Sequence, residues 1–237
     1  MPLATSEIHG LRISVLGGTD GIVIHPGRCR DFDDQRDIGI AMGESCLIRP
    51  ARVGLGGLDT GTMTPRTSYA VYLVRQGNDT EGMLSKAFDP NSADSPAFPN
   101  DGSLAYRRIG AVATDAEGRI LAAEQEGDEQ DRRYRYQAEQ PVLAALREGT
   151  AVELTPFDLA PFFHRYAKRA LIAVQPGNGV AVTIARDPSG AGSTLVEGPT
   201  TLPLEPADRA SPTVGYYRNA GARGSATISV IGFEETL

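Results

Sequence analysis

The sequence predicts an all-β fold of two β-sandwich or jelly-roll-like domains, with long loops and a short helical linker. The main observation is a series of short runs in which apolar and polar residues alternate, because this period of two places one face of a strand in a core. The second is punctuation by 27 glycines and 16 prolines, which argues against long helices. A length of 237 residues favours two modest domains, which we place at residues 1–140 and 141–237.

The N-terminal domain carries clear strand patterns. Leu11–Val15 alternates, and Gly21–His25 follows it and ends at a Pro-Gly turn, so these runs are expected to form a hairpin or meander. Tyr69–Val74 is apolar throughout, which indicates a strand buried on both faces. Tyr106–Ala113 and the returning run Arg119–Gln125 predict a second hairpin. The remaining expected features are a strand at Cys46–Val53 and an exposed irregular loop at Asp89–Gly102.

The C-terminal domain is expected to begin with the helical linker. Pro141–Glu148 fits a short helix, since proline suits the first helical position and Gly149 stands where a C-terminal cap is common. Beyond it, Val180–Ala185 and Ala226–Ile231 alternate and predict sandwich strands, each with one dry face. No repeat of fixed period and no long heptad stretch is visible, so no coiled coil is expected in this chain.

Five short motifs follow one another in the first half of the chain. They are the strand and Pro-Gly turn of Ile22–Asp31, the turn sequence of Gly56–Gly61, the strands Ser68–Val74 and Tyr106–Val112, and the closing Gly127–Glu129. In order and approximate spacing they resemble a domain of bacteriophage tail-fibre and related virion proteins, over roughly residues 22–136, with a departure at Ala70. The second half is similar to the domain that often follows it, at Thr150–Pro156, Arg169–Val174, Gly215–Tyr217 and Val230–Glu234.

This resemblance implies a non-catalytic structural protein of a virion. The expected role is that of a tail fibre or fibre-like component that contributes to host-surface attachment. The implied partners are further copies of the chain in a homotrimer, other virion proteins, and a host surface glycan or protein. The implied location is the virion, after assembly in the host cytoplasm.

Two other functions stay open at this point. One is a head-decoration or cement protein, or a tail adaptor, whose loops would bind other virion proteins. The other is a surface-glycan hydrolase, which needs two carboxylates about 5 to 10 Å apart across a groove. The sequence identifies no such pair.

Composition narrows the range of partners. A formal charge of −7 and a pI near 5.0 predict a surface that repels nucleic-acid phosphates. No apolar run approaches the roughly 20 residues that span a bilayer, so no membrane insertion is expected. Cys29 and Cys46 lack the spacing of a zinc site and are expected to be unpaired thiols, although a bridge between them stays open.

Two acidic patterns have a catalytic or metal-binding interpretation, and both fit loops better. Asp59–Gly61 spells the aspartic-protease triplet, but the glycines before it and Pro65 after it favour a turn. Four carboxylates between residues 31 and 37 are a candidate calcium set: Asp31, Asp33, Asp34 and Asp37. Interleaved arginines and the missing EF-hand glycine favour a charged loop with local ion pairs. The sequence therefore predicts no catalytic, cofactor-binding or metal-ligating residue.

The second half is rich in aromatic side chains, and part of this set is a candidate contact surface. The apolar stretch from residue 157 to 163 has a loop-like composition, which is typical of an interface patch. The alternative is that these rings fill the core of the domain. The candidate contact residues are Phe157, Phe162, Phe163, Tyr216 and Tyr217.

Overall fold

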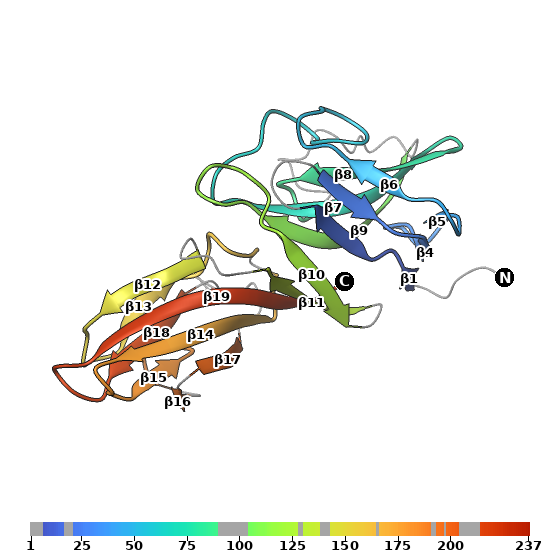
Figure 1. Cartoon of the computed structure of the whole chain (residues 1–237). Helices are drawn as coiled ribbons and strands as arrows, with labels where there is room; N and C mark the ends of the chain where they lie inside the picture. The colour runs from blue at the N-terminus through green and yellow to red at the C-terminus, as the bar shows by residue number, and fades with distance from the viewer. Residues whose placement is uncertain are drawn as a thin grey trace. The chain divides into compact units, whose positions relative to one another are not determined.

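The structure is a computed structural model that describes residues 7–16, 21–89, 104–127, 130–137, 143–164, 166–190, 193–196, 198–203 and 214–237 (Figure 1). Within these ranges the regular structure is nearly all β, arranged in several separate sheets, and no α-helix occurs. The all-β prediction is confirmed. Among the same residues no helix has the length and apolarity needed to cross a membrane. The expected loop at Asp89–Gly102 lies outside the described residues except for its first residue.

The chain divides into two compact units, Met1–Arg132 with Leu237, and Arg133–Thr236. The division falls inside strand β11 (Asp131–Tyr136) and therefore before the boundary expected between residues 140 and 141.

The first unit contains three antiparallel sheets of three strands each. Their orders are β1-β4-β5, β2-β3-β6 and β8-β7-β9. The strands are β1 (Ile8–Gly10), β2 (Ile13–Leu16), β3 (Gly21–Ile24), β4 (Gly27–Arg30), β5 (Asp37–Ile40), β6 (Cys46–Ile48), β7 (Ser68–Gln76), β8 (Asp79–Ser85) and β9 (Leu104–Ala113), followed by β10 (Ala123–Gly127). The expected hairpin of the first two runs is formed by β2 and β3, in which Ile13 pairs with Ile24.

Strand β7 is the centre of the first unit. All six residues from Tyr69 to Val74 are fully buried, so the prediction of a strand buried on both faces is confirmed. Gly82 of β8 pairs with Leu73 and faces Ile24 and Ile48 of the neighbouring sheet. A Cβ atom at Gly82 would lie 2.5 Å from Ile48 Cγ1, so the two sheets approach closely because this residue has no side chain.

The first unit also buries a complete arginine. Arg132 is 1 % exposed, and its guanidinium donates hydrogen bonds to the carbonyl oxygens of Leu11, Ile109 and Gly10 at 2.9, 2.8 and 3.0 Å. These carbonyls come from two segments, so one side chain connects residues 10 and 11 to β9. A buried cation needs such partners, because burial of an unpaired charge is costly.

The second unit has a β-sandwich-like arrangement of two sheets. One has the order β11-β19-β14-β17, with β12 also pairing β19, and the other has the order β13-β18-β15-β16. The strands not yet defined are β12 (Ala144–Gly149), β13 (Thr155–Asp158), β14 (Arg169–Gly177), β15 (Val182–Ala185), β16 (Thr194–Val196), β17 (Gly198–Pro203), β18 (Val214–Asn219) and β19 (Ser225–Thr236). Contacts between the sheets are close: a Cβ at Gly215 of β18 would lie 3.0 Å from Leu202 of β17.

The predicted helix at Pro141–Glu148 is wrong. Residues 144–149 form strand β12, which pairs with β19 through Ala144 and Ser229 and through Gly149 and Ala226. Pairing with the central strand of the sheet therefore overrides the local helix signals. Gly149 is a close-packing position and not a helix cap, because a Cβ there would lie 2.3 Å from the Tyr217 hydroxyl oxygen.

Candidate contact surface on the first unit

Four of the five candidate contact residues lie in the core of the second unit. The exposed fractions of Phe157, Phe162, Phe163 and Tyr217 are 4, 8, 1 and 4 %. Phe157 and Tyr217 meet between paired strands β13 and β18, with ring centroids 6.4 Å apart. Only Tyr216 is half-buried, between the buried residues Gly215 and Tyr217 of β18. The prediction of a contact surface at the four buried rings is thereby corrected: they fill the sandwich, which was the alternative interpretation.

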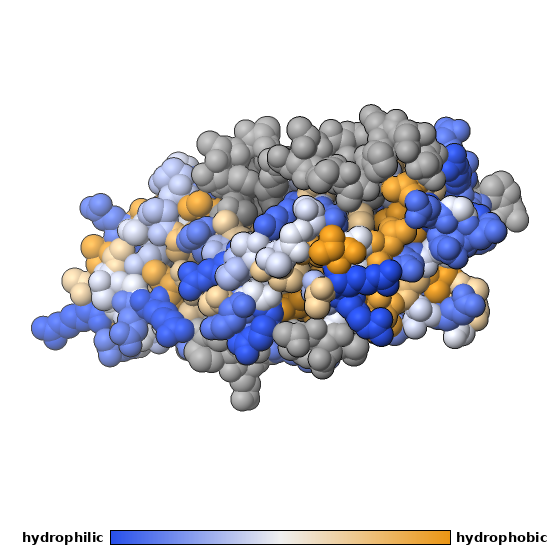
Figure 2. Space-filling view, turned by 90° about the horizontal axis from the view of Figure 1, so that it is seen from above, coloured by the Kyte–Doolittle hydropathy of each residue, from blue (hydrophilic) through white to orange (hydrophobic). Residues whose placement is uncertain are grey.

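Exposed apolar side chains are scattered among the described residues. The large ones are Phe32, Met42, Val53, Val152 and Leu195. On the face drawn in Figure 2, hydrophobic and hydrophilic residues alternate in small areas. Phe32 is 41 % exposed and is the one aromatic residue in this set from the described part of the chain. Single exposed aliphatic residues are ordinary, whereas an aromatic ring held in solvent is a better candidate for a contact residue.

The loop that presents Phe32 connects β4 and β5 and is tightly closed. Asp31 is 5 % exposed, and its carboxylate accepts the backbone N–H groups of Gln35 and Arg36 at 2.7 and 3.0 Å. The backbone N–H of Asp31 in turn donates to the Arg36 carbonyl at 2.9 Å. Arg30 and Asp37, at the two ends of the loop, form an ion pair of 3.0 Å. Side-chain and backbone hydrogen bonds therefore fix the loop in one conformation.

Phe32 is anchored to strand β9 by both its backbone and its ring. Its N–H donates to the Tyr106 carbonyl at 2.7 Å, and the rings of Phe32 and Tyr106 stack with centroids 5.9 Å apart and an interplanar angle of 22°. Tyr72, which is fully buried, meets Tyr106 edge to face at 6.5 Å and donates its hydroxyl to the Ala87 carbonyl. The exposed ring thus rests on a supported aromatic stack, which we call the Phe32–Tyr106 surface.

Three carboxylates act on the Tyr106 hydroxyl of this aromatic pair. Burial raises the pKa of Tyr106, and the carboxylates of Asp33, Asp31 and Asp89 raise it further. Asp33 and Asp89 are both exposed, whereas the Asp31 carboxylate is taken up by the loop backbone. Nearby on the same strand, the Arg108 guanidinium lies 5.9 Å from the centroid of the Phe88 ring. The neighbourhood of the exposed ring therefore contains charges of both signs.

The Asp59 triplet lies in a loop, as predicted. The carboxylate of Asp59 accepts the N–H of Thr60 at 2.7 Å and the hydroxyl of Ser85. The same loop is bound to β8, since the Gly56 N–H donates to the Gly82 carbonyl and the Leu84 N–H to the Gly57 carbonyl, both at 2.9 Å. Asp59 holds this loop against the sheet, which gives the carboxylate a structural use.

The aspartates between residues 31 and 37 serve the loop in a similar way. Asp31 accepts two backbone N–H groups and Asp37 pairs with Arg30, which agrees with the predicted charged loop with local ion pairs. In the portion of the chain that the structure describes, no group of three or more His, Cys, Asp or Glu side chains is arranged to hold a metal ion.

A buried pair in the second unit was not predicted from the sequence. His164 Nε2 lies 3.0 Å from Glu235 Oε2, and the two side chains are 2 and 0 % exposed. His164 Nδ1 accepts the Tyr166 N–H at 3.2 Å, so Nε2 is the ring nitrogen that faces the carboxylate. The two residues are 71 positions apart in the sequence, and no local pattern connects them. Because the pair is inaccessible, it is a structural feature and not a contact site.

Both cysteines are free thiols, as expected. Cys29 is fully buried, and burial raises its pKa to about 12 despite the opposing charges of Arg107 and Arg132. The thiol of Cys46 is half-buried and donates to the Thr80 carbonyl at 3.2 Å. A thiol with a raised pKa is a poor nucleophile at neutral pH, so Cys29 is a core residue.

Comparisons with family models, with curated proteins and with solved structures found no match to this chain.

Proposed function

We propose that this chain is a structural component of a bacteriophage virion, of the tail-fibre class, and that it contributes to attachment at the host surface. The observation that carries the proposal is the ordered set of five motifs that resembles tail-fibre proteins. Those motifs fall in the first unit: Ile22–Asp31 spans β3 and β4, Ser68–Val74 lies in β7, and Tyr106–Val112 lies in β9.

Residues of these motifs make the close contacts that hold the first unit together. Gly57 of the Gly56–Gly61 motif lies so close to Arg52 that a Cβ there would stand 2.1 Å from the Arg52 carbonyl oxygen. Leu58 of the same motif is fully buried, and Asp59 binds Ser85. Motifs of this kind specify the fold of a domain. The resemblance therefore supports a shared fold directly, and a shared role only through that fold.

The mechanism that we propose is contact by rigid scaffolds. Small β sheets with closed loops lose little conformational entropy on binding, because their loops are ordered beforehand. Several copies on one particle would convert weak single contacts into firm attachment. A trimer would be the unit of such a fibre, as the resemblance implies.

Electron microscopy of intact particles labelled with an antibody against this chain tests the proposal. The particles are those of the phage that encodes the chain. Label on the tail, at the end that meets the cell, is the expected result. Label on the capsid surface would favour head decoration or cementing instead. Particles without label would contradict a place in the virion.

Self-association is tested separately by size-exclusion chromatography with light scattering. A fibre-type assembly should have a mass near three times the 25.2 kDa of one chain. A monomer at all concentrations would contradict trimeric assembly. Release of reducing sugar from host polysaccharide by the purified chain would instead identify a hydrolase.

A further inference from the structure

We propose that Asn178 is a site of spontaneous deamidation, at which a side-chain amide is converted to a carboxylate and a link between two turns of the second unit is lost. This inference goes beyond the proposed function and does not depend on it. Three observations carry it: the residue that follows Asn178, the exposure of the turn, and one hydrogen bond of the amide.

Asn178 and Gly179 form the tip of the turn that follows β14. Both have a positive φ, 58° and 66°, and the Val180 N–H donates to the Gly177 carbonyl at 3.5 Å, in a conformation that Asn-Gly pairs favour. Both residues are exposed. The sequence Asn-Gly occurs once in the chain, at these two positions. The turn therefore presents the one Asn-Gly pair of the chain to solvent.

Deamidation of an asparagine begins at the backbone nitrogen of the residue that follows it. The Gly179 nitrogen gives up its proton and bonds to Cγ of Asn178, the Cγ–Nδ2 bond breaks, and ammonia leaves. The resulting succinimide ring is opened by one water molecule at either of its carbonyl groups, which yields aspartate or isoaspartate. Glycine favours the first step, because it has no Cβ to hinder the attack.

The amide of Asn178 also joins its own turn to the turn between β18 and β19. Its Nδ2 donates to the Arg223 carbonyl at 3.1 Å. The two turns pack closely, since a Cβ at Gly224 would lie 2.8 Å from Val180. Because Cγ must approach the Gly179 nitrogen, this hydrogen bond has to open before the ring can form. The carboxylate that results cannot donate to the Arg223 carbonyl, so the link is lost with the amide.

Two other described asparagines provide controls within the same molecule. Asn78 is exposed at the β7–β8 turn, as Asn178 is in its own turn, but Asp79 follows it. Asn219 is 2 % exposed, and its Nδ2 donates to two backbone carbonyls at 2.9 and 3.1 Å. Asn78 therefore tests the effect of the following residue, and Asn219 tests the effect of burial.

Peptide mapping by mass spectrometry of the full chain, aged in mildly alkaline buffer, tests the proposal. Tryptic cleavage isolates each of the three asparagines in its own peptide, residues 76–86, 170–186 and 219–223. We expect the 170–186 peptide to gain one mass unit and to separate into aspartate and isoaspartate forms, several-fold faster than 76–86 is converted. The 219–223 peptide should stay unchanged. Ageing in denaturing urea should accelerate conversion at Asn178, because its hydrogen bond to Arg223 is then open.

Two variants test the consequence for the turns. Asn178→Asp carries the aspartate product from the start, and Asn78→Asp adds the same charge at the β7–β8 turn. Backbone hydrogen exchange in the turn of residues 220–224 should be several-fold faster in Asn178→Asp and unchanged in Asn78→Asp. The reason is that only the first variant removes the donor to the Arg223 carbonyl.

Four results would overturn the inference. The first is conversion of Asn78 at the rate of Asn178, since the following glycine would then have no effect. The second is a rate at Asn178 that does not change in urea. The third is no conversion at Asn178 in the folded chain over the period in which the urea-treated chain converts fully. The fourth is unchanged hydrogen exchange at residues 220–224 in Asn178→Asp. None of these outcomes depends on the microscopy of particles, so the inference can fail while the proposed function stands.

Discussion

Phe233 in the second unit and Phe32 in the first unit both stack on a tyrosine, but they differ in exposure to solvent. In the second unit, Phe233 of β19 stacks on Tyr134 with centroids 4.6 Å apart and also contacts Phe163 at 6.1 Å, in a core from which solvent is excluded. In the first unit, Phe32 stacks on Tyr106 but stays 41 % exposed on a closed loop. Whether an aromatic residue lies in the core or on the surface is therefore set by the strand face or loop on which it stands. The number of aromatic residues near it in the sequence does not decide this.

The largest effect is expected in the buried cluster. Phe233 is 1 % exposed, so Phe233→Ala should lower the free energy of unfolding of the second unit by about 3 to 5 kcal/mol, through lost burial and the cavity that remains. Chemical denaturation followed by tyrosine fluorescence measures this change. Tyr216→Ala, at a half-buried position of β18, is the control and should cost clearly less. A loss below about 1 kcal/mol in Phe233→Ala would contradict the assignment of Phe233 to the core of the second unit.

A second large effect is expected at the buried cation of the first unit, Arg132. Arg132→Met keeps most of the side-chain volume but leaves the carbonyls of Gly10, Leu11 and Ile109 without their donor. The unfolding free energy of the first unit should fall by roughly 3 kcal/mol. Arg12→Met, at an exposed position, is the control and should change stability by less than about 0.5 kcal/mol. Equal stability of both variants would show that the buried guanidinium is dispensable.

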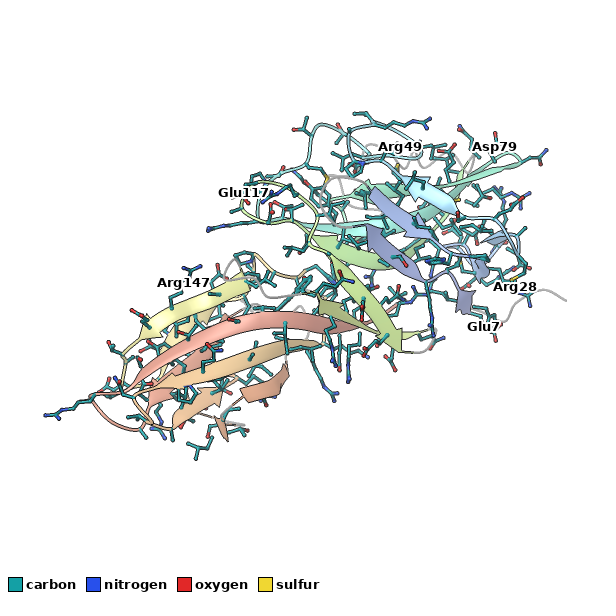
Figure 3. The ribbon with its side chains drawn as sticks, in the orientation of Figure 1. Glu7, Arg28, Arg49, Asp79, Glu117 and Arg147 are labelled. Atoms are coloured by element: carbon teal, nitrogen blue, oxygen red, sulfur yellow. The ribbon has the colours of Figure 1, made fainter. Side chains whose placement is uncertain are left out.

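A smaller effect depends on pH and tests how tightly the loops of the first unit are held. Partial burial raises the pKa of Asp115, but hydrogen bonds from Arg119 and from the Glu117 N–H outweigh it, and the net pKa is lowered (Figure 3 labels Glu117). A lowered pKa in the folded state stabilises the protein above the unfolded-state pKa of about 3.9, and this stabilisation is lost as pH falls through the folded value.

Asp115→Asn should therefore cost about 1 kcal/mol at pH 7 and progressively less below about pH 4. Denaturant midpoints of wild type and variant, measured from neutral to acidic pH, give the difference. A difference that grows as pH falls would have the wrong sign and would contradict the role of the ionised carboxylate.

The smallest effect is expected at the exposed aromatic ring itself. Phe32→Ala should lower the free energy of unfolding by only about 1 kcal/mol, because the ring loses its stack on Tyr106 but is 41 % exposed already. Differential scanning calorimetry measures it. A loss comparable to that of Phe233→Ala would place Phe32 in a core and remove the basis of the contact surface.

The strands could be predicted where the pattern is local. Alternation identified β2 and β3, and the unbroken apolar run identified β7 as buried on both faces. Features that depend on distant partners could not be predicted. The signals at Pro141 and Gly149 favoured a helix, yet pairing with β19 made residues 144–149 a strand.

The candidate site was predicted least well, for a related reason. Phe162 and Phe163 lie in a loop-like sequence, but the loop folds back so that Phe163 contacts Phe233, which is 70 positions away. Conversely, no hydrophobic pattern marks Phe32, because it stands among aspartates in a charged loop. A single aromatic residue within an acidic turn is the signal that could have identified it. No local sequence pattern indicates that Arg132 is buried or that His164 pairs with Glu235.

Hydroxyl-radical footprinting with mass spectrometry, on the intact chain in solution, tests the contrast between the two aromatic sets most directly. Oxidation of each aromatic side chain follows its exposure to solvent. We predict rapid modification of Phe32 and strong protection of Phe157, Phe162, Phe163 and Tyr217. Modification of Phe162 or Phe163 at the rate of Phe32, or protection of Phe32, would contradict the assignment of the contact surface to the first unit.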